Sequence, residues 1–127
     1  MVTSGLVNLY TKDIDAGVRF YRDVLGLRET FRTPREGVPD HVEFAAGGFT
    51  IGLGSVAAAR RVHGVEPVPG APAMAVVLWT DDVDATFSAV VAAGAPAVRG
   101  PRDAGNGNRT ALVRDPDGNL VELVSKV

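Results

Sequence analysis

A repeated segment constrains the fold of this chain more than any other feature. Thr11-Lys12-Asp13-Ile14-Asp15-Ala16 returns 69 positions later as Thr80-Asp81-Asp82-Val83-Asp84-Ala85. The stretch from Val42 to Leu53 overlays the stretch from Leu112 to Leu123 at a shift of 70, so one insertion or deletion separates the copies. Such a repeat within 127 residues predicts two copies of one supersecondary unit in tandem.

Each copy has the same predicted order of elements. An apolar run rich in β-forming residues leads into the repeated Thr-x-Asp, whose Asp13 or Asp82 stands at the N-cap of a predicted helix. Three further β-like runs follow each helix. The predicted strands are 6–10, 27–33, 41–46 and 49–54 in the first copy, and 74–79, 97–99, 109–114 and 119–125 in the second.

The two predicted helices carry apolar stripes, which we interpret as core packing. Gly26 and Gly94 are expected to end them. The stripes consist of Ile14, Val18, Tyr21 and Leu25 in the first helix, and of Val83, Phe87 and Val90 in the second.

These patterns predict one α+β domain over residues 1–127. Module one covers about 4–54, a linker covers about 55–72, and module two covers about 73–127. The linker holds three of the eight prolines, and a second glycine-rich stretch spans 100–108. Both are expected to be mobile loops at the rim of a cavity or plain connections.

Composition excludes several classes of function. Thirteen basic and 15 acidic residues give a formal charge of −2 without a basic patch, so neither nucleic acid nor a membrane is an expected partner. The absence of cysteine excludes disulfides and thiolate metal sites. No apolar run approaches the roughly 20 residues of a membrane helix, and no signal peptide is recognisable, so we expect a cytoplasmic protein.

Two motifs carry a resemblance to a known family. Phe20-Tyr21-Arg22-Asp23-Val24-Leu25-Gly26-Leu27 ends the first helix, and Asp115-Pro116-Asp117-Gly118-Asn119-Leu120-Val121-Glu122-Leu123 lies near the C-terminus. With the tandem β-α-β-β-β modules, they make the chain resemble the vicinal oxygen chelate superfamily of glyoxalase I, bleomycin-resistance proteins, fosfomycin-resistance enzymes and extradiol dioxygenases. The resemblance implies cupped mixed sheets that hold a ligand or a metal, and a homodimer.

The resemblance also implies where a metal would bind. In the metal-dependent members, the first and fourth strands of each module supply one ligand apiece, and the matching positions here are Leu6, Gly52, Ala75 and Glu122. Only Glu122 carries a donor atom, whereas an open catalytic metal site needs about three protein ligands. We therefore predict neither a metal nor a cofactor.

An alternative site uses residues near Glu122. If Arg114 pairs with Asn119, Ala111 faces Glu122, and Val113 and Arg109 lie on the same side of the sheet. The repeat then places His41 and Glu43 at the matching positions of module one. Together with Glu122, they could form a displaced metal site or an acid/base pair.

The predicted pocket combines these positions with others of the same strand parity. Trp79, the only tryptophan, is expected to stack on a planar ligand or to fill the core or a dimer interface. The predicted ligand-binding set is Leu6, Asn8, Tyr10, His41, Glu43, Thr50, Gly52, Ala75, Val77, Trp79, Arg109, Ala111 and Glu122.

Two functions follow, with a purely structural or regulatory partner domain as a third. The first is a metal-independent binding protein that sequesters a hydrophobic or planar natural product or metabolite, as in the antibiotic-resistance branch of the superfamily. The alternative is a glyoxalase-like lyase, isomerase or dioxygenase that uses Glu122 as its candidate catalytic residue, with or without His41 and Glu43. The ligand, and whether its cup forms within one chain or across a dimer, stay open.

Overall fold

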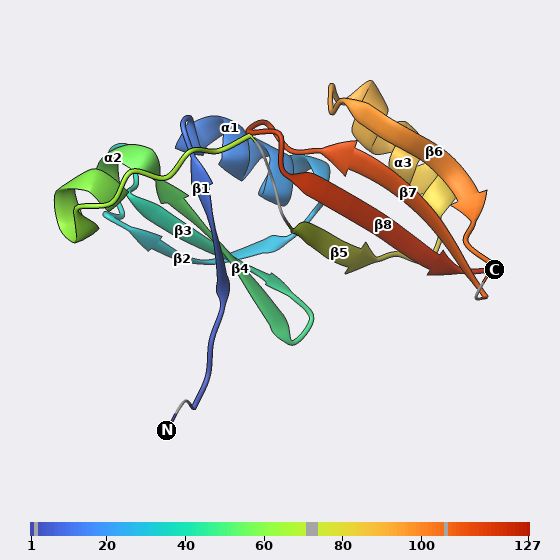
Figure 1. The fold of residues 1–127 in the computed structure, drawn as a ribbon, viewed down its shortest axis with the longest axis horizontal. Helices are drawn as coiled ribbons and strands as arrows, with labels where there is room; N and C mark the ends of the chain where they lie inside the picture. Colours follow the sequence, from blue (N-terminus) through green and yellow to red (C-terminus); the bar gives the residue numbers. More distant parts are fainter. Residues whose placement is uncertain (2, 71–73, 106) are drawn as a thin grey trace. The chain divides into compact units, whose positions relative to one another are not determined.

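The computed structural model describes residues 1, 3–70, 74–105 and 107–127. The chain divides into two compact units, Met1–Pro69 and Gly70–Val127 (Figure 1). Residues 71 and 72 of the predicted linker, residue 73 at the start of module two and residue 106 of the second glycine-rich stretch lie outside the described residues.

Unit 1 contains a mixed four-stranded sheet in the order β1-β4-β3-β2. Strand β1 is parallel to β4, and the other neighbours are antiparallel. The elements are β1 (Val7–Thr11), α1 (Ile14–Val18), the π-helix η1 (Arg19–Val24), β2 (Arg28–Thr33), β3 (His41–Ala46), β4 (Phe49–Ser55), α2 (Val56–Ala58) and the π-helix η2 (Ala59–His63).

Unit 2 repeats this topology in the order β5-β8-β7-β6, with β5 parallel to β8. Its elements are β5 (Ala75–Trp79), α3 (Val83–Ala92), β6 (Ala97–Asp103), β7 (Asn108–Arg114) and β8 (Leu120–Lys126). The predicted α+β fold with two β-α-β-β-β modules is confirmed.

The repeated Thr-x-Asp sequence caps the first helix of each unit. An Asp13 side-chain oxygen accepts a hydrogen bond from the backbone N–H of Ala16 at 3.1 Å, and Asp82 does the same for Ala85 at 3.0 Å. These bonds satisfy N–H groups that a helix leaves unpaired at its start, so the repeated motif begins the first helix of both units.

One face of each sheet packs against a helix. In unit 1, the Tyr21 ring of η1 lies 6.1 Å from the Phe44 ring of β3. In unit 2, α3 contacts β7 and β8 (Figure 1). The opposite face of each sheet, here called the open face, carries the intervening residues. Buried strand residues on the helix side include Leu9, Val42, Phe44, Ile51 and Leu53 in unit 1 and Val76, Ala111, Val113, Val121 and Leu123 in unit 2.

The first predicted stripe gains a residue near its end. Ile14, Val18 and Tyr21 are buried and Leu25 is half-buried, but Phe20, which lies outside the predicted stripe, is buried as well. The cause is the wider winding of η1, where the Leu25 N–H donates to the Phe20 carbonyl five residues earlier, at 2.9 Å. In α3, Val83 and Val90 are buried and Phe87 is half-buried.

The two predicted loops are partly ordered elements. The linker contains α2 and η2, and the Ser55 side chain caps α2 by accepting from the Ala58 N–H at 3.0 Å. The second glycine-rich stretch begins inside β6, which continues to Asp103. Among the described residues, none of the helices has the length and apolar character needed to cross a membrane.

Candidate functional site

The open face of unit 1 brings together seven of the predicted ligand-binding residues. The strand register places Asn8 of β1 and Glu43 of β3 on either side of Gly52 in β4. His41 pairs with Gly54 on the same face. Alternation along the strands adds Leu6, Tyr10 and Thr50 to this face.

Glycines in β4 let these side chains close over the strand. A Cβ atom at Gly52 would lie 2.8 Å from Asn8 Oδ1, 2.9 Å from His41 Cε1 and 3.1 Å from Leu6 Cδ1. One at Gly54 would lie 2.8 Å from Asn8 Nδ2. The space of the metal-ligand position Gly52 is therefore filled by neighbouring side chains.

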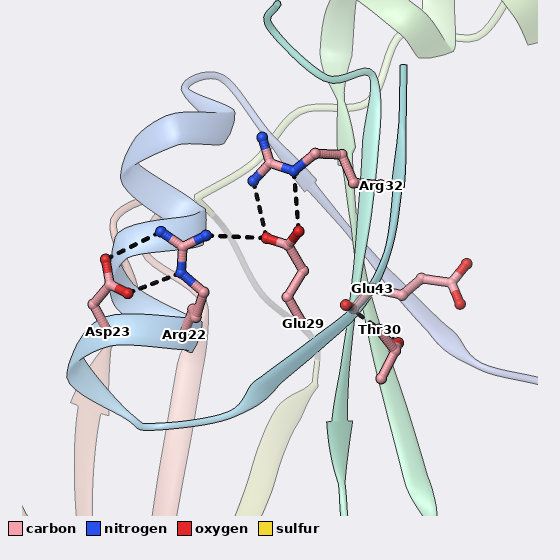
Figure 2. A network of polar contacts seen from close by, with 6 residues as sticks. All are labelled: Arg22, Asp23, Glu29, Thr30, Arg32 and Glu43. Atoms are coloured by element: carbon pink, nitrogen blue, oxygen red, sulfur yellow. Dashed lines mark hydrogen bonds and ion pairs between the residues drawn. The ribbon is translucent and has the colours of Figure 1, made fainter. Parts of the chain in front are cut away.

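His41 and Glu43 form a hydrogen-bonded pair. His41 Nε2 lies 2.9 Å from Glu43 Oε2, and the two side chains are 26% and 25% exposed. The Phe31 ring of β2 lies 6.2 Å from the His41 ring. Figure 2 shows the Glu43 carboxylate pointing away from Glu29, which lies on the helix side. Such a pair can accept a hydrogen bond from a ligand or take a proton from it.

The open face of unit 2 is more apolar. Glu122 of β8 lies between Val77 of β5 and Leu112 of β7. Ala75 and Trp79 share the Val77 side of β5. Among the described residues, the Glu122 carboxylate forms neither a hydrogen bond nor an ion pair.

Trp79 lies at one end of this face and is 60% exposed. The Lys126 ammonium is 4.9 Å from the centroid of its ring, a cation–π contact. Trp79 also lines an open depression of about 470 Å³ with Thr80, Asp81 and Lys126. The indole is thus accessible to a ligand and not buried in the core of unit 2.

The predicted register of β7 and β8 is wrong. Arg114 pairs with Leu120 and not with Asn119, so Leu112 and not Ala111 lies opposite Glu122. Ala111 is fully buried on the α3 side. This slip of one residue moves every β7 side chain to the other face, and both Ala111 and Arg109 leave the predicted site.

Arg109 instead joins β7 to α3. Its guanidinium donates to Asp84 at 2.6 Å and to Asp103 at 3.1 Å. The Asp84 carboxylate, and then that of Asp103, raise the pKa of Arg109 further above its usual range. Arg109 therefore has a structural role on the helix side.

The turn between β7 and β8 explains the slip. Asp115 N–H donates to the Asn119 carbonyl at 2.9 Å, whereas Ala46 pairs directly with Phe49 in the first hairpin. Module two thus has one more residue inside the turn. His41 and Glu43 therefore correspond to Thr110 and Leu112, and not to Ala111 and Val113. The pairing of β3 with β4 nevertheless places His41 and Glu43 on the open face, as predicted.

The metal that this fold family implies does not fit the residues present. Of the four matching positions only Glu122 has a donor side chain. Throughout the described ranges, no three His, Cys, Asp or Glu side chains are grouped so that they could hold a metal ion.

Sequence reasoning missed several residues of the open faces. The predicted register puts Leu112 and Thr110 on the helix side, whereas the structure puts them on the open face. Phe31 reaches the open face of unit 1 through a shift in the β2–β3 pairing between Glu29 and Phe31. Lys126 lies beyond the predicted last strand. Ala111, Leu112 and Val113 are all apolar, so the β7 sequence carries no alternation that could have placed Leu112 on the open face.

Comparison with known proteins identifies the family. The model of the Glyoxalase/Bleomycin resistance protein/Dioxygenase superfamily matches residues 3–123. The crystal structure of TioX from Micromonospora sp. ML1 is similar, with 30% identity, a TM-score of 0.78 and coverage of 98% of this chain and 100% of that chain. No curated protein matches.

Two further structures share the fold at lower identity. A glyoxalase-related enzyme from Fulvimarina pelagi has 23% identity and a TM-score of 0.82, over 99% of this chain and 89% of that chain. A hypothetical protein from S. aureus also has 23% identity and a TM-score of 0.82, over 98% and 94%.

Proposed function

Since this chain belongs to the Glyoxalase/Bleomycin resistance protein/Dioxygenase superfamily, we propose that it is a metal-independent binding protein that sequesters a hydrophobic or planar natural product or metabolite. The observation that carries this proposal is the replacement of metal donors by apolar residues. Leu6, Gly52 and Ala75 offer no ligand atom, and the space at Gly52 is filled.

The open faces have the character of small-molecule sites. Trp79 and Val77 in unit 2 present exposed apolar surface beside the Glu122 carboxylate. In unit 1, Phe31 lies beside the polar pair of His41 and Glu43. Apolar walls with a few polar groups are typical of pockets for small organic ligands.

Trp79 allows a direct test of binding. Because it is the only tryptophan, its fluorescence reports on the open face of unit 2 alone. We expect saturable quenching by a planar, non-fluorescent probe, caffeine, in protein that has been stripped of metal by a chelator. Linear quenching without saturation would contradict the proposal.

A matched pair of variants locates the probe. Val77 and Val98 are 48% and 45% exposed, but only Val77 adjoins Glu122 on the open face. Val77→Asp is expected to weaken binding by about tenfold, because it places a charge in the apolar contact. Val98→Asp is expected to have no effect, and equal weakening by both variants would argue against this site.

A second candidate function rests on the 2.9 Å contact between His41 and Glu43. A hydrogen-bonded imidazole and carboxylate can abstract a proton without a metal, as in a lyase or isomerase. The similar protein from Fulvimarina pelagi is described as a glyoxalase-related enzyme. For an enzyme, His41→Gln should abolish turnover of a substrate and leave its binding intact, whereas a binding protein should show no turnover to lose.

A further inference from the structure

An arginine-rich depression lies on the helix side of unit 1, away from the open face. Its volume is about 480 Å³. Residues of α1, η1, β2 and the loop after β2 line it. These residues are Asp15, Val18, Arg19, Arg22, Glu29, Arg32 and Arg35.

Glu29 holds two of the arginines in place. Its Oε1 accepts from Arg22 Nη1 at 3.1 Å and from Arg32 Nη2 at 2.9 Å, and its Oε2 accepts from Arg32 Nε at 3.1 Å (Figure 2). Asp23 binds the other side of Arg22 at 2.8 Å. The Arg32 guanidinium, and then that of Arg22, lower the pKa of the Glu29 carboxyl, which stays ionised.

These contacts leave N–H donors available. A guanidinium has five N–H donors, and Glu29 uses two of those on Arg32, so three are left. Within the described part of the chain, the side chains of Arg19 and Arg35 form no hydrogen bond or ion pair, although the charge of Arg19 adds to that of Arg22 in lowering the pKa of Asp23. Both are exposed.

The charge of the depression favours an anion. Four guanidinium groups and two carboxylates line it, which gives a balance of +2. Arg22, Arg32 and Glu29 have a structural role, because their contacts fix the helix to β2. This role does not explain why Arg19 and Arg35 also line the depression. Arginines already held in place lose little side-chain entropy when they bind an oxyanion.

We propose that this depression binds a small phosphate monoester. Its dianionic phosphate matches the positive balance, and its oxygens match the paired donors of guanidinium groups. Arg19 and Arg35 supply donors that no described residue takes up, and Arg22 and Arg32 form the fixed wall. This inference is independent of the proposed function of the open faces.

The test is an NMR titration of the arginine Nε–Hε signals with phenyl phosphate, at constant ionic strength set by chloride. We expect saturable shifts at Arg19 and Arg35, with weaker binding of acetate. Inorganic phosphate should bind as tightly as phenyl phosphate if the phosphate group alone is recognised, and more weakly than phenyl phosphate if the organic part also contributes. Shifts that stay linear, or equal saturation by acetate, would overturn the proposal.

A charge-matched control separates a specific site from general attraction. Arg19→Gln combined with Arg35→Gln should weaken phenyl phosphate binding at least about tenfold, since two charge-assisted hydrogen-bond partners are lost. The control combines Arg28→Gln with Arg102→Gln, which removes the same charge. Neither arginine lines the depression: Arg28 pairs with Ala45 and lies on the open face of unit 1, and Arg102 belongs to unit 2. Equal weakening in both double variants would overturn the proposal, provided that circular dichroism shows both folded.

Discussion

At the scale of single residues, the open face of unit 1 depends on a missing side chain. Gly52 matches, by the family resemblance, a position that supplies a ligand in metal-dependent members, and its neighbours Asn8, His41 and Leu6 lean into the space. Restoring a ligand there would require these side chains to move. The missing side chain at Gly52 therefore permits the close packing of this face.

Gly52→Ala is expected to lower the free energy of unfolding by at most about 1 kcal/mol, because the new methyl group displaces only the ends of the Asn8, His41 and Leu6 side chains. Asn8 Oδ1 and His41 Cε1 would both lie within 2.9 Å of the added Cβ. Urea denaturation measures the change. Gly48→Ala is the control, since nothing lies within 4 Å of its Cβ position; a loss of equal size there would contradict the steric explanation.

Glu29→Gln tests the ion pairs on the helix side. The Arg32 guanidinium lowers the folded-state pKa of Glu29, so the stabilisation is present above the unfolded pKa of about 4.3 and is lost as the pH falls through the folded value. We expect a loss of about 0.5–1 kcal/mol at neutral pH, because the groups are partly solvated.

Urea denaturation at pH 7 and in acid measures this difference. Wild type and Glu29→Gln should converge once the pH lies below the folded-state pKa of Glu29, where both side chains are neutral. Glu36→Gln, at an exposed loop position, is the control. A difference between wild type and Glu29→Gln that persists in acid would show that packing and not charge is responsible.

At the scale of elements, the turn between β7 and β8 decides which side chains face Glu122. Asp115 is buried, and its side chain accepts from the N–H groups of Asp117 at 2.9 Å and Asn119 at 2.8 Å. These bonds fix the extra residue inside the turn. Leu112 is thereby placed opposite Glu122.

Asp115→Ala is expected to cost about 1–2 kcal/mol of stability, because two partly buried N–H groups of the turn lose their acceptor. Asp115→Asn should cost less, since its amide oxygen can still accept from the two backbone N–H groups of the turn. Thermal unfolding of the two variants measures the contrast. Equal losses would show that the negative charge of Asp115, and not its acceptor geometry, stabilises the turn.

At the scale of the whole molecule, two units of one topology each keep an open sheet face. Phe31, Val77 and Trp79 are exposed on these faces. Apolar surface and sheet edges of this kind are usually covered by association.

We expect a homodimer, so gel filtration with light scattering should give twice the mass of the 127-residue chain. A clean monomer at micromolar concentration would contradict this prediction. Dilution provides the internal control, because only a dimer can lose mass as the concentration falls.

The sequence by itself determined the order of the eight strands and the two Asp-capped helices, the tandem modules and the helix caps. Each depends on residues close together in the chain, such as Asp82 and the N–H of Ala85. It also determined that Ala75, Val77 and Trp79 share one side of β5, because strand alternation is local.

Only the tertiary structure decided the register of β7 against β8, the winding of η1 and the network around Glu29. The pairing of Arg114 with Leu120 depends on how the Asp115 turn closes. A slip of one residue between β7 and β8 changes neither the sequence of either strand nor its predicted position in the chain. It does exchange Ala111 for Leu112 as the residue opposite Glu122. Arg22 and Arg32 meet at Glu29 only because the helix packs beside β2, which no periodicity in the sequence encodes.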